Sequence, residues 1–229
     1  MAGKSCLTLK DVNAYYGKTQ ILRNVSMNVK EGEIVCLVGR IGAGKTTCFR
    51  AIMGLIPRTG YIDFLGKNLV GKQPYEIARM GIGYAPEGRR LYSELTVEEN
   101  LKVGTKRSDD KLELIYELFP RLKERRNFKA KFLSGGEKQM LVIAQALIHD
   151  PKLLLVDEPF EGLALPVRNK LVEAFQKMKK EKLTVLVAEA NLLNVKPIAD
   201  EIYVIHRGEI VFHGGFKEVE EFRRARPIF

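Results

Sequence analysis

The sequence predicts an α/β fold, in which a parallel core sheet carries a small antiparallel β subdomain and an inserted helical subdomain. Three observations support this prediction. In the second half of the chain, short β-branched apolar runs alternate with segments of helical periodicity, as in parallel sheets. The first 30 residues alternate apolar with polar side chains, which is typical of a half-buried antiparallel sheet. Between Glu87 and Leu133, strand patterns give way to helical ones.

Glycine and proline divide the first part of the chain into elements. Residues 33–39 ("EIVCLVG") form an apolar run that ends in glycine, which predicts a buried strand. Residues 45–54 ("KTTCFRAIMG") then predict a helix that stops at Gly54. Residues 111–126 predict helix on either side of Pro120, because proline cannot continue a helix.

The second part of the chain alternates helices and strands. A helix with regular apolar spacing begins at Ser134, and the apolar run at 153–157 ("LLLVD") predicts a buried strand. A helix from about Val167 and a strand at 184–189 follow. Residues 201–214 predict a closing hairpin turned by an Arg-Gly pair.

Length and composition predict one domain. The chain has 229 residues and is 45% apolar, enough for one sizeable core, so we expect a single domain over 1–229 with the helical subdomain at about 87–146. No apolar run approaches the roughly 18 to 20 residues that cross a bilayer, and the N-terminus lacks the apolar centre of a secretory signal. We therefore expect a cytoplasmic chain. Cys6, Cys36 and Cys48 have no C-x-x-C spacing, so we interpret them as reduced and structural.

The formal net charge of +10 permits three interpretations: a nucleic-acid partner, an anionic membrane surface, or a solvated lysine-rich exterior. We favour the solvated exterior, because no basic stretch is interleaved with aromatic residues as in RNA-binding signatures. The cluster "KMKKEK" at 177–182 is typical of the end of an amphipathic helix, and the C-terminal "FRRARPIF" is too short to define a nucleic-acid site. No nucleic-acid partner is expected.

A phosphate-binding loop is predicted between the strand at 33–39 and the following helix. "GRIGAGKTT" fits G-x-x-x-x-G-K-[ST], and its backbone N–H groups and the helix N-terminus would bind phosphate oxygens. Lys45 would meet the β- and γ-phosphates, and the Thr46 hydroxyl would bind Mg²⁺. The alternative, a glycine-rich turn with an accidental lysine, is disfavoured by the position of the motif. The residues predicted to contact ATP here are Gly39, Arg40, Ile41, Gly42, Ala43, Gly44, Lys45, Thr46 and Thr47.

The middle of this loop raises two further expectations. Arg40 would bring a second cation near the phosphates and tighten ATP binding. Ile41 would be strained if its position requires a positive φ.

Two carboxylates follow the strand at 153–157, at the strand end where sites in open α/β sheets form. Asp157 would hold the magnesium, directly or through water, and Glu158 would polarise the attacking water. Adjacent carboxylates can also be solvated loop residues, but their pairing with a phosphate loop favours catalysis. Glu158 and Lys45 are therefore candidate catalytic residues.

The segment "LSGGEKQ" at 133–139 begins a helix. Ser134 would cap it, and Glu137 would complete a capping box. This does not explain Gly135 and Gly136, each of which can cost up to about 1 kcal/mol relative to alanine. We therefore expect a group to approach this backbone closely, and a phosphate is the physical candidate. Because the chain already has a phosphate loop, this site would serve a nucleotide held by another chain.

"LSGGE" shortly before "LLLVDEP", with "GRIGAGKTT" far upstream, resembles the ATP-binding subunits of ABC transporters over essentially the whole chain. The resemblance implies a RecA-like P-loop NTPase core, and ATP and Mg²⁺ as ligands. It also implies a homo- or heterodimer of ABC ATPase subunits, in which each phosphate loop faces the partner's Ser134-Gly135-Gly136. Tyr16 falls where the family stacks an aromatic side chain on adenine, although from the residues alone it could equally be a sheet residue.

Residues 81–101, with "PEGRR" and "LTVEENL", and residues 158–166 are similar to the subunits that energise import of branched-chain amino acids and related amide or urea importers. The implied function is ATP hydrolysis that drives a membrane importer. Permease subunits and, indirectly, a solute-binding protein would be partners, and the chain would lie at the cytoplasmic face of the membrane. Glu87 falls where most ABC ATPases have a magnesium-contacting glutamine, so it is a candidate metal ligand and catalytic residue.

Three departures from the family pattern bear on mechanism, and the first is the Arg40-Ile41 pair, which stands where the family usually has Pro-Asn. Ala190 occupies the switch position, usually histidine or glutamine, and its side chain cannot hydrogen-bond a γ-phosphate. This site would then hydrolyse ATP slowly or depend on a complete second site in a partner. Gln145 replaces a usual arginine, which would loosen a structural contact. Two rival hypotheses follow: a soluble ABC ATPase acting on nucleic acid, and a regulatory nucleotide binder with weak turnover.

Overall fold

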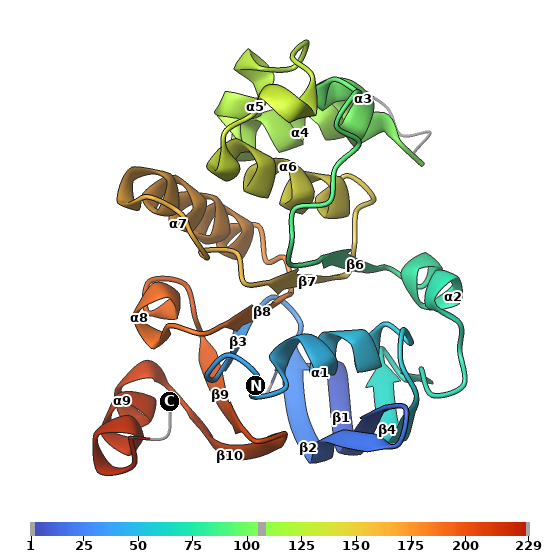
Figure 1. Ribbon diagram of the computed structural model, residues 1–229, viewed down its shortest axis with the longest axis vertical. Helices are drawn as coiled ribbons and strands as arrows, with labels where there is room; N and C mark the ends of the chain where they lie inside the picture. Colours follow the sequence, from blue (N-terminus) through green and yellow to red (C-terminus); the bar gives the residue numbers. More distant parts are fainter. Residues whose placement is uncertain (1–2, 105–108, 228–229) are drawn as a thin grey trace.

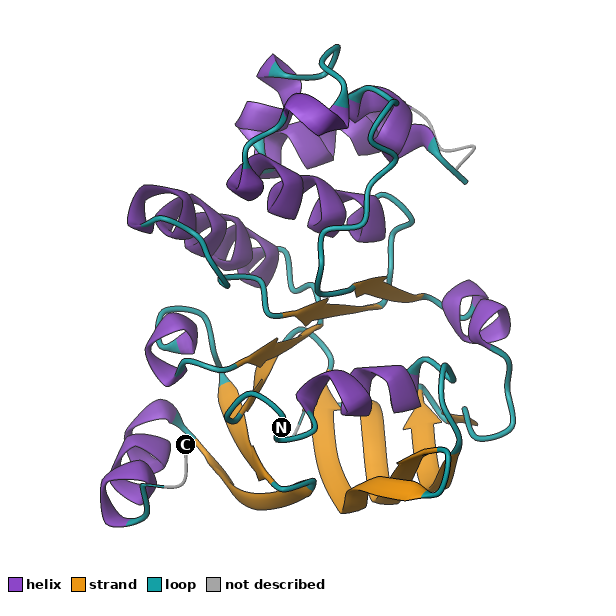
Figure 2. Ribbon diagram, in the orientation of Figure 1, coloured by secondary structure: helices purple, strands orange, loops and turns teal. Residues whose placement is uncertain are grey.

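The computed structural model describes residues 3–104 and 109–227. Two sheets lie against one another, and a group of helices extends beyond the larger sheet (Figures 1 and 2). The antiparallel sheet has the order β2-β1-β4-β5, and its strands are β1 Ser5–Tyr16, β2 Thr19–Lys30, β4 Arg58–Phe64 and β5 Lys67–Asn68. The larger sheet has the order β10-β9-β3-β8-β7-β6, and its strands are β3 Ile34–Val38, β6 Ile82–Ala85, β7 Leu153–Asp157, β8 Val185–Glu189, β9 Glu201–His206 and β10 Glu209–Gly214.

The helices occupy three places in the chain. In the first half they are α1 Lys45–Ile52 and α2 Pro74–Arg79. Between β6 and β7 they are α3 Val97–Lys102, α4 Asp109–Leu118, α5 Pro120–Glu124, a 3-10 turn Ala130–Phe132 and α6 Gly135–Leu147. The remaining helices are α7 Leu165–Lys180, α8 Leu192–Val195 and α9 Phe216–Ala225. The helices predicted on either side of Pro120 and from Ser134 are confirmed.

Parallel pairing brings the site residues to one edge of the larger sheet. β3 pairs in parallel with β8 and β9, and β7 pairs in parallel with β8 and β6. The register aligns Val38 with Glu189, and Asp157 with Ala188. Because the carboxyl ends of these strands meet at the same edge, the loops after β3, β7 and β8 lie together.

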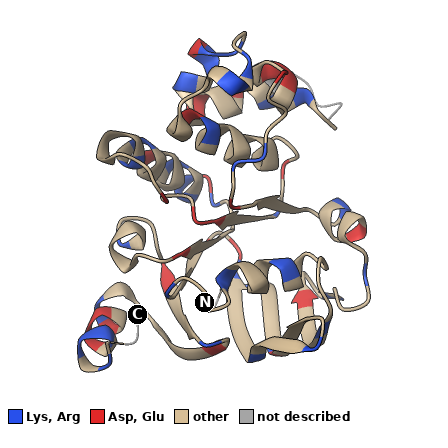
Figure 3. Cartoon of the chain, in the orientation of Figure 1, with Lys and Arg blue, Asp and Glu red and all other residues tan. Residues whose placement is uncertain are grey.

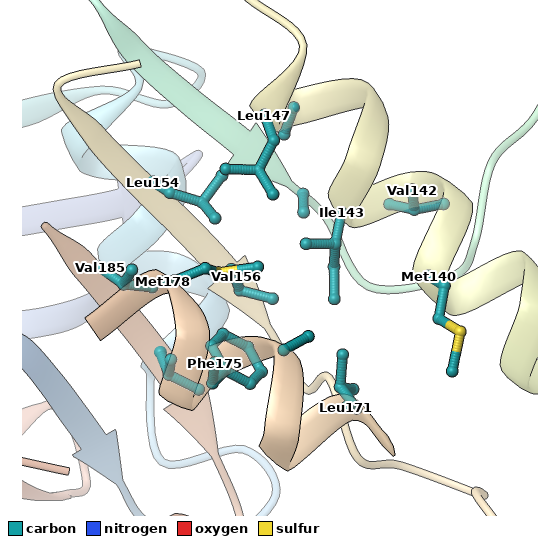
Figure 4. Packing of buried hydrophobic residues seen from close by; sticks show 14 of the residues in the cluster. Met140, Val142, Ile143, Leu147, Leu154, Val156, Leu171, Phe175, Met178 and Val185 are labelled. Atoms are coloured by element: carbon teal, nitrogen blue, oxygen red, sulfur yellow. The ribbon is translucent and has the colours of Figure 1, made fainter. Parts of the chain in front are cut away.

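Hydrophobic side chains pack on both faces of the larger sheet. Between the two sheets, α1 buries an apolar face that includes Phe49 and Ile52. On the opposite face, α6 and α7 cover β7 and β8, and Figure 4 shows their side chains pointing toward one another. Burial of each large apolar side chain contributes about 1.5–3 kcal/mol, so these contacts fix the strands whose ends carry the site.

The predicted α/β fold class, with its antiparallel sheet and inserted helices, is confirmed. In the described residues, no helix is both long enough and apolar enough to span a bilayer. Lys and Arg positions are interspersed with Asp and Glu positions along the helices in Figure 3. This distribution favours the solvated basic exterior as the explanation of the net charge.

Candidate active site

The phosphate loop connects β3 to α1. Gly44 caps α1 with φ 115°, and Gly42 has φ 80°, so both positions favour glycine. Gly39 is required for a different reason, because a Cβ there would lie 2.3 Å from the Ile205 carbonyl oxygen. The loop is also held from outside, since the Gly208 N–H donates to the Ala43 carbonyl oxygen at 2.9 Å.

Lys45 is buried under this loop, with 4% of its surface exposed. Its Nζ donates to the carbonyl oxygens of Gly39 at 2.7 Å and Arg40 at 3.2 Å. It also forms an ion pair with Glu158 Oε1 at 2.9 Å. A buried ammonium requires such oxygen partners, and the protein's own carbonyl and carboxylate oxygens supply them.

The middle of the loop differs from what the sequence led us to expect. Ile41 is 89% exposed and does not have a positive φ, because Gly42 makes the left-handed turn, so the expected strain is absent. Arg40 Nη2 donates to the Pro227 carbonyl oxygen at 3.3 Å. The predicted second cation is therefore directed to the C-terminal segment in this structure, and not to the phosphate site.

Asp157 meets the helix that follows the phosphate loop. Thr46 Oγ1 donates to its Oδ1 at 3.2 Å, and the Tyr84 hydroxyl donates to its Oδ2 at 3.2 Å. Burial raises the pKa of Asp157 to about 6, although both hydroxyl bonds act in the opposite direction. A divalent cation would oppose that rise by stabilising the carboxylate.

This donor set fits Mg²⁺. Thr46, Asp157 and Glu87 offer hydroxyl and carboxylate oxygens, the hard donors that Mg²⁺ prefers, and Glu87 is exposed at the rim of the pocket described below. The described residues contain no cluster of three or more His, Cys, Asp or Glu that could hold a metal ion. Mg²⁺ needs no such cluster, since it typically takes one or two carboxylates and completes its shell with phosphate and water oxygens.

Glu158 lies at the centre of the site with a strained backbone, φ 47°. Its Oε1 pairs with Lys45, and its Oε2 accepts from the Ala190 N–H at 3.0 Å. Its side chain is 11% exposed. The carboxylate predicted to polarise water is thus held on both oxygens.

The segment after β8 contributes through its backbone. The Ala190 N–H also donates to Glu189 Oε1 at 2.9 Å, and the Asn191 N–H donates to the same oxygen at 3.0 Å. Glu189 is buried, and desolvation raises its pKa. At the switch position, a main-chain group therefore makes the contact with Glu158, and the alanine side chain contributes no polar atom.

A pocket of about 380 Å³ collects these groups, a volume within the range of ordinary ligand sites. The predicted residues that line it are Ile41, Gly42, Gly44, Lys45, Thr46, Thr47, Glu87 and Glu158. Residues that line it but were not predicted are Phe160, Glu161, Gly162, Arg168, Glu189, Asn191 and Asn194. Glu189 could have been predicted from the sequence, because it ends the predicted strand at 184–189. No sequence feature indicates Arg168.

Tyr16 does not belong to this lining. It is 39% exposed, and its hydroxyl accepts from Arg50 Nη1 at 3.0 Å, on the last turn of α1. The aromatic side chain is thus held beside α1, outside the polar pocket.

Ser134, Gly135 and Gly136 also lie outside the pocket. The predicted capping box is confirmed: Ser134 Oγ accepts from the Glu137 N–H at 3.2 Å, and Glu137 Oε2 accepts from the Ser134 N–H at 2.9 Å. A Cβ on Gly136 would lie 2.3 Å from Val167 Cγ1, so helix α7 of the same chain makes the close approach there. Another chain's phosphate is therefore not needed to explain that glycine. Ser134 and Gly135 are exposed.

Gln145 keeps a contact between helices. Its Nε2 donates to the Asn100 carbonyl oxygen at 3.0 Å and joins α6 to α3. The loosened contact expected at this position is therefore replaced by a hydrogen bond.

The fold and the site define a P-loop ATPase that binds nucleotide. Residues 22–161 match the family described as ABC transporter. The chain is 44% identical over 213 residues to the high-affinity branched-chain amino acid transport ATP-binding protein BraG of Pseudomonas aeruginosa, covering 90% of this chain and 91% of that one. It is 32% identical to the probable branched-chain amino acid transport ATP-binding protein LivF of Archaeoglobus fulgidus, covering 95% of each chain.

Solved structures agree with the sequence comparisons. The ADP conformation of an ATP-binding cassette of an ABC transporter superposes with a TM-score of 0.85 at 26% identity, covering 98% of this chain and 96% of that one. The chain belongs to the ABC transporter family and is one of its ATP-hydrolysing, ATP-binding subunits. The resemblance read from its motifs is confirmed, and neither rival hypothesis is favoured.

Proposed function

We propose that this chain hydrolyses ATP to drive the import of branched-chain amino acids. The observation that supports it best is the meeting of Lys45 and Glu158 at 2.9 Å in a pocket that also holds Thr46. A phosphate loop and a water-polarising carboxylate are the two parts that hydrolysis requires. The names of the relatives from Pseudomonas aeruginosa and Archaeoglobus fulgidus support the cargo.

Nucleotide binding would rearrange the contacts of Lys45. The β- and γ-phosphates would take Lys45 from Glu158 Oε1, because phosphate oxygens carry more charge than one carboxylate. The N–H groups of the Gly39–Thr47 loop would bind the remaining phosphate oxygens. Glu158, released from its cation, would then orient and polarise the attacking water.

Different residues would bind the two ends of ATP, the phosphates with their Mg²⁺ and the adenine. Thr46, Asp157 and Glu87 would hold Mg²⁺, which neutralises charge that develops on the phosphates. Tyr16 would stack on adenine, a role supported by its exposure beside α1.

The proposed dimer explains why Ser134, Gly135 and Gly136 lie away from this chain's own pocket. The exposed start of α6 offers backbone N–H groups to an anion, and in a dimer that anion would be the γ-phosphate held by a second ABC ATPase subunit. Whether the second subunit is identical or only related, two composite sites would form.

The proposed contact with the permease is a groove of about 780 Å³ between α2, β6 and α6. Arg79, Arg90 and Gln145 are among its polar lining residues. We propose that a permease subunit docks there, with residues 87–146 acting as the helical subdomain that moves with it. This would hold the chain at the cytoplasmic face of the membrane and connect it indirectly to a solute-binding protein.

The test measures ATP turnover by the chain, alone and mixed with its related subunit, for wild type, Glu158→Gln and Glu173→Gln. Glu173 is an exposed carboxylate on α7 and serves as the matched control. We expect Glu158→Gln to lower kcat by about 100-fold or more, the scale of losing a group that acts in the transition state. Turnover in Glu158→Gln equal to that of the control would contradict the role of Glu158.

A separate experiment tests the cargo by measuring leucine uptake in cells that lack the chain. Unchanged uptake would exclude branched-chain amino acids as the cargo.

A further inference from the structure

Three functional segments meet at one side chain that does not line the nucleotide pocket. Arg89 lies two residues after Glu87 in the chain that leaves β6, which runs past α6 toward α3 (Figure 1). Its Nε donates to Gln139 Oε1, in the second turn of α6, at 3.0 Å. Its Nη2 donates to the carbonyl oxygen of Glu161, three residues after Glu158, at 2.5 Å.

The guanidinium is also pressed against the start of α6. A Cβ on Gly135 would lie 3.0 Å from Arg89 Nη1, and a Cβ on Gly162 would lie 3.9 Å from Nη2. A side chain at Gly135 would crowd the end of the Arg89 side chain, whereas the distance at Gly162 is an ordinary van der Waals contact. Arg89 thus lies close to the backbone of Gly135 at the start of α6.

The backbone conformation at Gly88 and Arg89 directs the Arg89 side chain toward these partners. Gly88 has φ 92° and Arg89 itself has φ 48°, so two successive residues are left-handed. Arginine rarely adopts this conformation, and a residue held in it persists where its surroundings over-determine it. The surroundings here are the two hydrogen bonds to segments distant in sequence.

An arginine is suited to this position for a geometric reason. Its planar fork presents Nε and Nη2 to two acceptors in fixed directions, whereas a lysine ammonium is a single point. Gln139 is buried, and its Nε2 has no hydrogen-bond partner in the described part of the chain, so Arg89 supplies the one contact that orients this amide.

We infer that Arg89 is a positioning residue that couples this chain's own nucleotide site to the surface it offers to the second subunit. It joins the Glu87 loop to Gly135 and Gln139 of α6, and to the Glu161 loop that follows Glu158. This inference rests on the proposed dimer, in which Glu87 serves one nucleotide and the start of α6 serves the other. Through these contacts of Arg89, a change in the position of the Glu87 loop would be transmitted to the start of α6.

The test compares wild type, Arg89→Ala, Arg89→Lys and Arg126→Ala in the preparation that turns over ATP. Arg126 is an exposed arginine of the same helical region, outside the site and the groove. Affinity is measured with a fluorescent ATP analogue, and kcat and the Hill coefficient by phosphate release. For Arg89→Ala we expect unchanged affinity within about twofold, kcat lower by about 10- to 100-fold, and lost cooperativity, the effect of misplacing groups by about 1 Å.

Two further variants separate positioning from a simple loss of folding. Gln139→Leu removes the acceptor and retains the volume, so it should reproduce the kcat defect, and the double variant Arg89→Ala, Gln139→Leu should be no worse than either alone. Arg89→Lys should recover only part of kcat. Wild-type kcat in Arg89→Ala, an equal loss of affinity and kcat, or additive effects in the double variant would each overturn the inference and leave the ATPase assignment standing. No turnover in wild type would overturn both.

Discussion

The ion pair between Lys45 and Glu158 determines what ATP must displace. Both side chains are largely buried, and their atoms lie 2.9 Å apart where the phosphates would bind. Each side chain neutralises the charge of the other. ATP therefore competes with a carboxylate of the same chain, and the free energy of binding contains the cost of separating the pair.

Removing that competitor should strengthen nucleotide binding. Glu158→Gln replaces the carboxylate by a neutral amide of similar size, so Lys45 no longer loses an ion pair when it meets the phosphates. We expect ATP affinity to rise by about fivefold, equivalent to about 1 kcal/mol. Titration with a fluorescent ATP analogue measures it, with Glu173→Gln as the control. Weaker binding in Glu158→Gln would mean that Glu158 holds Lys45 in place for ATP.

Ala190 gives a prediction about rate. Its methyl group lines the pocket, and its N–H already serves Glu158 and Glu189, so this position has no donor left for a γ-phosphate. Ala190→His should add one and raise hydrolysis at this chain's own site by up to about tenfold. The measurement uses a dimer whose other site is disabled, because the second site would otherwise dominate. Unchanged turnover there would show that the backbone N–H suffices.

The hairpin of β9 and β10 supports the phosphate loop from outside. Its turn residue Gly208 donates to the Ala43 carbonyl oxygen and accepts from the Arg23 N–H at 2.8 Å. A Cβ on Gly208 would lie 1.8 Å from the Ile21 carbonyl oxygen, so the turn packs tightly against the antiparallel sheet. The strands β2, β9 and β10, none of which is adjacent to the loop in sequence, thus fix its shape.

A comparison of Gly208 with Gly66, which has nearly the same φ, distinguishes the loss of this packing from the strain of a positive φ. Gly208 has φ 84° and Gly66 has φ 81°, but a Cβ on Gly66 would meet nothing within 4 Å. Both alanine variants should lose about 1 kcal/mol from the positive φ. Gly208→Ala should lose a further 1–3 kcal/mol or so from overpacking, and only this variant should bind ATP more weakly. Urea unfolding and ATP titration measure both effects, and equal behaviour of the two variants would contradict the support.

The elements that could be predicted from the sequence were those that are long enough or buried enough to show a clear pattern. The strand at 153–157 was predicted residue for residue, because a buried parallel strand requires a continuous apolar run. The strand β6 and the helix α2 have four and six residues, too few to establish a period, and were not predicted. The helix α9 did carry a signal, with Phe216, Val219 and Phe222 at three-residue spacing, but its basic end obscured the apolar face.

The site divides in the same way. Lys45, Asp157 and Glu158 were predictable, because their chemistry requires short motifs at the ends of strands. The contacts of Arg89 were not, because they depend on two left-handed residues and on loops that sequence patterns do not place. The same holds for the inward position of Arg168, which follows from how α7 packs.

The whole molecule buries all three of its thiols, one in each of β1, β3 and α1. Burial raises the pKa of Cys6 to about 11 and that of Cys48 to about 12, and it also raises the pKa of Cys36. All three cysteines are buried and none is in a disulfide, which is consistent with the expected structural role. Because these thiols lie in both sheets and in the helix between them, their reactivity reports on the part of the fold that carries the phosphate loop.

Labelling with a thiol reagent at pH 8 should therefore measure unfolding of the two sheets and of α1. In the folded state the raised pKa leaves almost no thiolate, whereas unfolding returns each thiol to an ordinary pKa of about 8.5 and exposes it. We expect no rapid labelling in buffer and three labelled thiols per chain in urea. ATP binds only the folded chain, so ATP at about 100 times its Kd should slow labelling at low urea by about 100-fold. Lys45→Ala should abolish that protection, since it removes a phosphate contact and leaves the thiols in place. Rapid labelling of any thiol in buffer, or protection that persists in Lys45→Ala, would show that the thiols respond to local opening or to ATP at another place on the molecule.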